Sequence, residues 1–180
     1  MTVPSSIETE AVVPTDVAPV VDAGPPPVEA AAEAVLSGRI SYVDADGEVR
    51  PDAGARILIV PEERSGSSRL APEGFRAGAD DADRSLAVAS IRAVGGDFVT
   101  ADADGNYAAM LPAAGLYQVL IVSRYQPRAE GSAPDAAAMQ VLAGYFDRPA
   151  QVIGESALHA SPFRYRGSGA STRDQTFERP

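Results

Sequence analysis

Alternating and continuous apolar runs divide the chain beyond residue 34 into expected strands. Residues 35–50 alternate, with Leu36, Ile40 and Tyr42 on one face, which is typical of a strand covered on one side. Residues 55–61 form a continuous apolar run, which predicts a strand buried on both faces. Residues 98–123 predict three further strands. The last two strands are expected at 159–165 and 175–178.

Helical spacing occurs in two other segments. Residues 80–94 predict a helix that Asp80 or Asp81 caps and that Gly95 and Gly96 end, with an apolar stripe of Leu86, Val88, Ile91 and Val94. A second helix is expected over residues 134–146. The polar stretch up to residue 78 is typical of a long surface loop.

The tetrapeptide Asp-Ala-Asp-Gly occurs twice, beginning at Asp44 and at Asp102. An Asp-Gly pair between apolar runs favours a tight hairpin turn, because Gly accepts positive φ. We therefore expect two hairpins rather than a duplicated domain. Together these elements predict a mainly β protein, a β-sandwich of about seven strands, with the two helices inserted on its rim.

Composition separates the first 34 residues from the rest. They contain six acidic residues, six prolines and no basic residue. Such a segment cannot bury a core, so we predict a disordered acidic linker over residues 1–34 and a sandwich domain over residues 35–180. The linker lacks the basic and apolar regions of a signal peptide. It leaves two interpretations open: a plain disordered tail, or a spacer that follows an upstream anchor.

Charge and residue content exclude several classes of function. The net charge of −10 argues against a nucleic-acid partner, which would need a basic face. No stretch reaches the roughly 18 apolar residues of a membrane span. The chain has no Cys, which excludes disulfides and thiolate chemistry, and it has no Lys.

Residues 36–126 resemble the carboxypeptidase regulatory-like domain, a transthyretin-like (prealbumin-like) sandwich. The resemblance lies in a Thr-x-x-x-x-Gly-x-Tyr pattern, a run that ends in Leu-Pro, and Gly-x-Tyr-x-Val. It also lies in an opening Gly-bearing strand followed by Gly-Ala-x-Ile. The matching residues are Gly38, Gly54, Ala55, Ile57, Thr100, Gly105, Tyr107, Leu111, Pro112, Gly115, Tyr117 and Val119. Tyr107 and Tyr117 are expected to cover the core with their hydroxyls at its edge.

This resemblance implies an antiparallel Greek-key sandwich without catalytic residues, cofactor or metal. It further implies a structural or protein-interaction module of a bacterial cell-envelope protein, with a protein or a neighbouring domain as partner and an extracytoplasmic location. The Lys–Asn isopeptide bond of related adhesin sandwiches is impossible here, because the chain has no Lys.

The segment Tyr165–Ser168 also resembles the closing Tyr-Arg-Gly-Ser of hydroxyisourate hydrolases, which are enzymes of the same superfamily. Their histidine motif would fall at residues 41–44, where Ser41 replaces the histidine. His159 is the only histidine in the chain, so the two-histidine site of those enzymes cannot form. A degenerate hydrolase would have to use His159, Arg39 and Ser168.

Binding of calcium or carbohydrate is a further alternative. Neither Asp-Ala-Asp-Gly copy has EF-hand ligands at the first and last loop positions, and Asp80, Asp81 or Asp83 would be needed for another kind of calcium site. Sugar-binding sandwiches usually expose aromatic rings. This chain has no Trp, and we expect core packing to account for most of Tyr125, Tyr145, Phe146, Phe163 and Tyr165.

Overall fold

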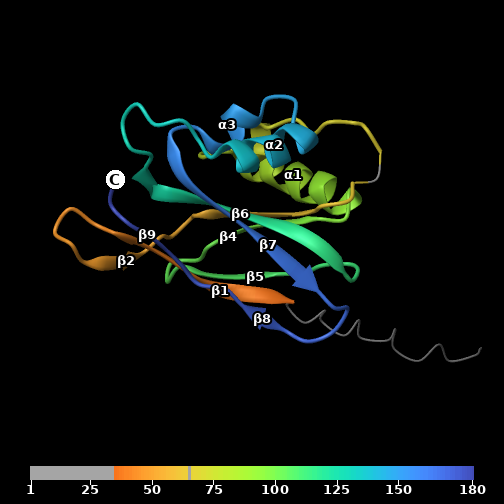
Figure 1. Ribbon diagram of the computed structural model, residues 1–180, viewed down its shortest axis with the longest axis horizontal. Coiled ribbons are helices and arrows are strands. Elements are labelled where there is room, and N and C mark those ends of the chain that lie inside the picture. Colours follow the sequence, from red (N-terminus) through yellow and green to blue (C-terminus); the bar gives the residue numbers. More distant parts are fainter. Residues whose placement is uncertain (1–34, 65) are drawn as a thin grey trace, which may run out of the picture. The chain divides into compact units, whose positions relative to one another are not determined.

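The computed structural model describes residues 35–64 and 66–180, and these residues form two β-sheets covered by a layer of helices (Figure 1). The mainly β architecture confirms the coarse expectation of a sandwich. The predicted linker, residues 1–34, lies outside the described residues.

Sheet one is organised around β1 (Leu36–Val43). One edge of β1 pairs antiparallel with β5 (Asn106–Ala109) and then with β2 (Val49–Pro51). The other edge pairs in parallel with β8 (Ser171–Thr172) and β9 (Gln175–Phe177). The expectation of a wholly antiparallel fold is therefore wrong for these two strands, because the C-terminal segment crosses from sheet two and runs in the direction of β1.

Sheet two has the order β4 (Asp97–Thr100), β3 (Arg56–Pro61), β6 (Gly115–Pro127) and β7 (Ser156–Tyr165). All three strand pairs are antiparallel. The described residues thus form nine strands rather than about seven, since the two-residue β8 and the three-residue β2 are too short to be recognised from their pattern.

The two sheets enclose an inner core. Alternate residues of each strand point into it, as the period of two requires. Its largest members are Leu36, Ile40, Ile57, Ile59, Tyr107, Tyr117, Val119, Ile121, Phe163 and Phe177. Leu36 and Ile40 share this face as expected, and Tyr42 packs against its edge.

An outer core fills the other face of sheet two, beneath α1 (Asp81–Ala93), α2 (Ala136–Tyr145), α3 (Pro149–Ile153) and the short 3-10 helix η1 (Glu73–Phe75). The expectation that the helices lie on the rim is wrong, because they form a third layer (Figure 1). Leu58, Val60, Leu120 and Val122 must be covered on that face, and each such side chain contributes about 1.5–3 kcal/mol when buried. The continuous run of β3 correctly predicted burial on both faces.

Helix α1 packs on the outer core through Val88, Ile91 and Val94 of its predicted stripe, and the prediction is wrong only for Leu86. Ala87 and Ile91 are buried, whereas Leu86 is 67% exposed. A Cβ on Gly74 would lie 2.7 Å from the Cβ of Ala87, so η1 approaches α1 too closely for a large side chain between them. Asp80 caps the helix as expected by accepting the amide of Asp83. The "loop" before α1 also contains the buried Phe75, which the polar pattern concealed.

The two Asp-Ala-Asp-Gly segments have the same local structure but different positions in the fold. The Asp44 carboxylate accepts the amides of Asp46 and Glu48, and that of Asp102 accepts those of Asp104 and Asn106. The first turn closes the β1–β2 hairpin, as expected. The second does not form a hairpin, because it connects β4 of sheet two with β5 of sheet one.

Hydrogen bonds hold the C-terminal strands β8 and β9 against β1. The backbone amide of Arg39 donates to the Asp174 carboxylate (2.8 Å), and that of Arg173 donates to the Ser37 carbonyl (2.8 Å). A Cβ on Gly38 would lie 1.8 Å from the carbonyl oxygen of Arg173. Glycine is therefore required at residue 38 for β1 to accept this segment.

Candidate functional site

The three hydrolase candidates lie on separate surfaces. His159 is on β7, opposite Ile121 and on the face that also carries Phe163. Burial lowers its pKa, and the positive charge of Arg173 lowers it further. Arg39 lies on the outer face of sheet one, where its Nε donates to the Asp104 carbonyl (3.0 Å). Ser168 is exposed in the segment between β7 and β8. The structure does not bring these side chains together.

The aspartates that suggested calcium have other partners. Hydrogen bonds from Arg50 and from the backbone lower the pKa of Asp44, and the Asn106 and Asp104 amides lower that of Asp102. Asp80 caps α1. Within residues 35–64 and 66–180, no group of three or more His, Cys, Asp or Glu side chains has the geometry to hold a metal ion.

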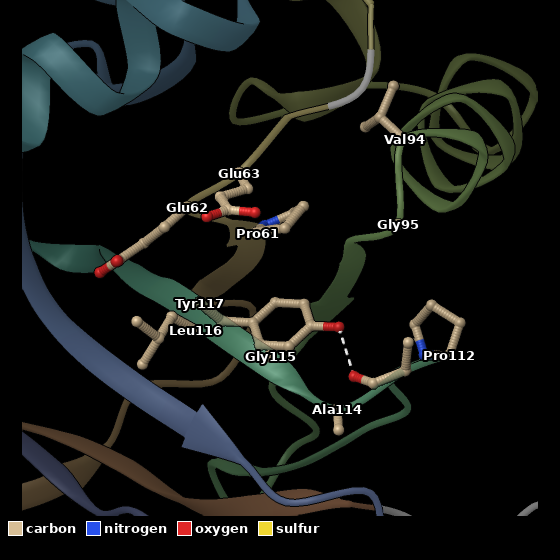
Figure 2. Close-up of a pocket in the computed structure, with 11 residues that line it drawn as sticks. Pro61, Glu62, Glu63, Val94, Gly95, Pro112, Ala114, Gly115, Leu116 and Tyr117 are labelled. Carbon is tan, nitrogen blue, oxygen red and sulfur yellow. Dashed lines mark hydrogen bonds between the residues drawn. The ribbon is translucent and has the colours of Figure 1, made fainter.

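A groove with a volume of about 430 Å³ lies at the rim where β3 ends and β6 begins. This rim groove is lined by Pro61, Glu62, Glu63, Val94, Gly95 and residues 112–117. Figure 2 shows the Tyr117 hydroxyl pointing to the loop that carries Pro112 and Ala114; it donates to the Ala113 carbonyl (2.7 Å). The ring is only 3% exposed, so it offers no face to a ligand, and burial raises the pKa of the hydroxyl.

Acid–base chemistry has few candidates in this groove. Apart from Tyr117, its titratable side chains are Glu62 and Glu63, and Glu62 accepts a hydrogen bond from Gln118 (2.8 Å). No lining residue pairs a nucleophile with a base. The side chains that line this groove therefore show no arrangement for catalysis.

A second surface, the aromatic end, lies where β1 and β6 leave the sandwich. Tyr42 and Tyr125 stack with ring centroids 5.1 Å apart and an interplanar angle of 29°. Core packing accounts for most of the five aromatic residues, as expected: Tyr145, Phe146 and Phe163 are buried, and Tyr165 packs against the inner core. Tyr125 is the exception, because it is 49% exposed. The β6–β7 register shifts between Val122 and Pro127, so Tyr125 lies in an irregular part of this strand pair.

Basic and polar groups surround the aromatic end. The guanidinium carbon of Arg124 lies 5.6 Å from the centre of the Tyr125 ring. A depression of about 260 Å³ adjoins the two tyrosines and is lined by Tyr42, Val43, Asp44, Ala45, Tyr125, Gln126, Pro127, Arg179 and Pro180. Gln126 is buried and donates to the Glu178 carbonyl (2.8 Å), which holds the C-terminal residues against this surface.

Sequence reasoning missed the aromatic end because the alternation of β6 appeared to continue. The detectable signal was Arg124, the first charged residue after the apolar run: Ser123 is still buried, whereas Arg124 and Tyr125 are exposed. Tyr and Arg are enriched in the buried centres of interfaces, and an exposed ring beside a guanidinium is a recurrent binding element. The residues of this surface are therefore of the types that are enriched in contact sites.

Comparison with known proteins leaves the family open. No protein-family model matches the chain, and no curated protein matches it. A solved structure from Pseudomonas aeruginosa, provisionally described as a carbohydrate-binding protein, covers 82% of this chain and 89% of its own length at 12% identity, with a TM-score of 0.38. At that TM-score the likeness carries no argument about this chain. Across the described ranges, no helix is long and apolar enough to cross a membrane.

Proposed function

We propose that the chain is a non-catalytic protein-interaction module of the bacterial cell envelope, and that the aromatic end is its contact surface. The observation that carries this proposal is the half-exposed Tyr125 ring, stacked on Tyr42 and flanked by Arg124. Amphipathic rings bury large areas at low entropic cost, and with Arg they dominate binding energy at interfaces.

We also propose that the fold is a transthyretin-like Greek-key sandwich related to the carboxypeptidase regulatory-like domain. The support comes from the structural roles of the matched residues. Gly105 has φ +82°, and a Cβ there would lie 2.3 Å from the Ile40 carbonyl oxygen. The buried Tyr107 and Tyr117 each donate to a backbone carbonyl, at Arg173 and Ala113, as expected for rings that close the core edge.

The envelope location rests on this resemblance and is tested separately. Intact cells of the source organism are treated with an external protease, and peptides of this chain are then identified in the released material. Release of these peptides without release of a cytosolic marker is the expected result. Full protection of the chain would contradict the location while leaving the contact surface unaffected.

The contact surface is tested with Tyr125→Ala and the matched control Leu86→Ala. Leu86 is 67% exposed and lies on α1, so the control also removes an exposed apolar side chain. Cross-linked material is recovered from cells that produce the tagged wild type or either variant. We expect a discrete partner band with the wild type and the control and its loss with Tyr125→Ala. Equal recovery from all three would contradict the proposal.

Carbohydrate binding is the second candidate, and the exposed face of Tyr125 favours it. Sugar rings stack on such a face, while nearby polar groups form hydrogen bonds with the hydroxyls of the sugar. A glycan array separates the two functions, because a sugar that binds the wild type and fails to bind Tyr125→Ala would replace the protein partner as ligand. Hydroxyisourate turnover above the buffer rate, lost in His159→Ala, would instead support the degenerate hydrolase.

A further inference from the structure

Four arginines line one cavity between sheet two and the helical layer. The cavity has a volume of about 270 Å³, and we refer to it as the arginine cavity. Its remaining lining is glycine, Ala77, Phe98 and Thr100, and no acidic side chain lines it. The four basic residues are Arg56, Arg76, Arg84 and Arg124.

The arginines come from four different segments. Arg56 begins β3 and Arg124 is near the end of β6, and both lie on the helix-covered face of sheet two together with Val122. Arg84 is in the first turns of α1, and Arg76 follows η1. The cavity therefore forms only when the helices cover the sheet, which explains why no sequence pattern reveals it.

Arg56 forms the floor of this cavity. It is only 5% exposed, and its Nη1 donates to the carbonyls of Phe75 (2.7 Å) and Val152. Burial lowers the pKa of Arg56 to about 10, so the guanidinium stays charged at physiological pH. Arg84 is half-buried, with Nη2 bonded to the Ala79 carbonyl (2.9 Å), whereas Arg76 and Arg124 are exposed at the mouth.

Protein carboxylates do not neutralise this group of charges directly. Within the part of the chain that the structure describes, the ion pairs closer than 4.0 Å involve Arg50, Arg92 and Arg148, and none of the four cavity arginines. The fully buried Asp52 acts on Arg56 at longer range and raises its pKa, against the larger lowering effect of burial. Its oxygens accept from the Ser123 hydroxyl and the Arg124 amide rather than from a guanidinium.

The concentration of positive charge runs against the composition of the chain. Acidic residues outnumber arginines by 25 to 15, yet every charged side chain that lines this cavity is an arginine. Arg56 is buried with backbone carbonyls as its acceptors and with no carboxylate of the described residues within 4.0 Å, and an anion inside the cavity would compensate its charge. Guanidinium groups present paired N–H donors that match the oxygens of phosphate and similar anions.

We propose that the arginine cavity binds a small oxyanion of the phosphate or sulfate type, free or as the terminal group of a larger ligand. The volume lies just below the roughly 300–1,000 Å³ of clefts that enclose whole organic ligands, so it suits a charged group and not an entire metabolite. This site is distinct from the aromatic end, although Arg124 borders both surfaces. It does not depend on the proposed protein partner.

Isothermal calorimetry with inorganic phosphate and with sulfate, against chloride at equal ionic strength, tests the proposal on the full chain. The informative variant is Arg76→Gln with Arg84→Gln, which leaves Arg56 and Arg124 in place. The matched control is Arg164→Gln with Arg166→Gln, because both are exposed and lie outside the cavity. Far-UV circular dichroism confirms that each variant is folded.

We expect phosphate or sulfate to bind the wild type and the control alike, and to bind the cavity variant at least about tenfold more weakly, since hydrogen bonds to charged groups are lost. Equal binding to all three proteins, or no heat beyond that of chloride, would overturn the proposal. Arg56→Met provides a second variant, for which we also expect loss of binding.

A phosphate monoester, glycerol phosphate, distinguishes the two sources of the anion. Tighter binding than that of inorganic phosphate would indicate that the cavity holds the end of a larger ligand. Weaker binding would indicate a free anion.

Discussion

Sheet one and sheet two differ in how many of their faces are covered. Sheet two lies between the inner and outer cores, so β3 and β6 are apolar on both faces. Sheet one packs only through the inner core, and its other face carries polar and exposed residues such as Arg39 and Val49. Sheet two therefore contributes side chains to both cores, whereas sheet one contributes to the inner core alone.

The largest expected effect comes from truncating a side chain in the middle of sheet two. Leu120 is fully buried in the outer core, so Leu120→Ala should lower the free energy of unfolding by roughly 2–5 kcal/mol. Val49→Ala, on β2 of sheet one, should change it by less than about 0.5 kcal/mol, because Val49 is 66% exposed. Urea unfolding of both variants measures the difference, and equal losses would refute the unequal coverage.

A smaller effect is expected where sheet one holds the C-terminal segment. The Tyr107 hydroxyl donates to the Arg173 carbonyl (2.9 Å), and burial raises its pKa to about 12. Tyr107→Phe should cost about 1 kcal/mol, because it leaves that carbonyl without its donor. Urea unfolding measures the cost, and hydrogen exchange at the amides of β8 and β9 should accelerate. Unchanged exchange there would show that the hydroxyl does not hold the segment.

The turn that connects the two sheets should contribute a pH dependence. Backbone amides hold the pKa of Asp102 below its ordinary 3.8, so its carboxylate stabilises the fold above that pH, and the contribution is lost as pH falls through the folded pKa. Asp102→Asn keeps an acceptor oxygen but removes the titration. Below pH 3.8 we expect the melting temperature of Asp102→Asn to fall less steeply with decreasing pH than that of the wild type. Thermal unfolding across the acid range measures this difference.

Asp52 provides the contrasting case within the same experiment. Burial raises its pKa, so the wild type should lose stability as pH rises from 3.8 to the folded pKa of Asp52. Asp52→Asn should remove this loss of stability between pH 3.8 and the folded pKa of Asp52. The two aspartates thus affect stability in opposite directions: the stability contributed by Asp102 increases as pH rises, and that contributed by Asp52 decreases. A shift of both variants in the same direction would contradict these assignments.

The smallest expected effect concerns the helical layer. Leu86→Ala should change the free energy of unfolding by less than about 0.5 kcal/mol, because Leu86 is 67% exposed, whereas Ile91→Ala on the same helix should cost several times more. Chemical denaturation of the pair measures the ratio. A large loss at Leu86 would show that this side chain is packed and not exposed.

Local patterns were sufficient for most elements of the fold. The continuous run of β3 predicted burial on both faces, and the caps Asp80 and Gly95 bounded α1 correctly. The third layer was not predictable in the same way, since an apolar helix face packs equally well on a rim or on a sheet. The second Asp-Ala-Asp-Gly turn shows a related limit, because its hydrogen bonds do not specify which strands it joins.

The proposed sites were less predictable than the fold, because long-range packing creates them. Tyr125 stacks on Tyr42 of a different strand, and the cavity arginines belong to segments between residues 56 and 124. By contrast, the residues that sequence similarity suggested, His159, Arg39 and Ser168, lie on different surfaces. A short matching segment indicated these candidates, and such a match does not establish that the side chains lie close together.

Site-specific photo-cross-linking tests the central claim, that the aromatic end contacts a protein, most directly. A photoreactive phenylalanine analogue replaces Tyr125 in one chain and Leu86 in another, and both are irradiated in cells of the source organism. We expect a discrete cross-linked protein from position 125 and none from position 86. No product at position 125, or the same product from both positions, would contradict the claim.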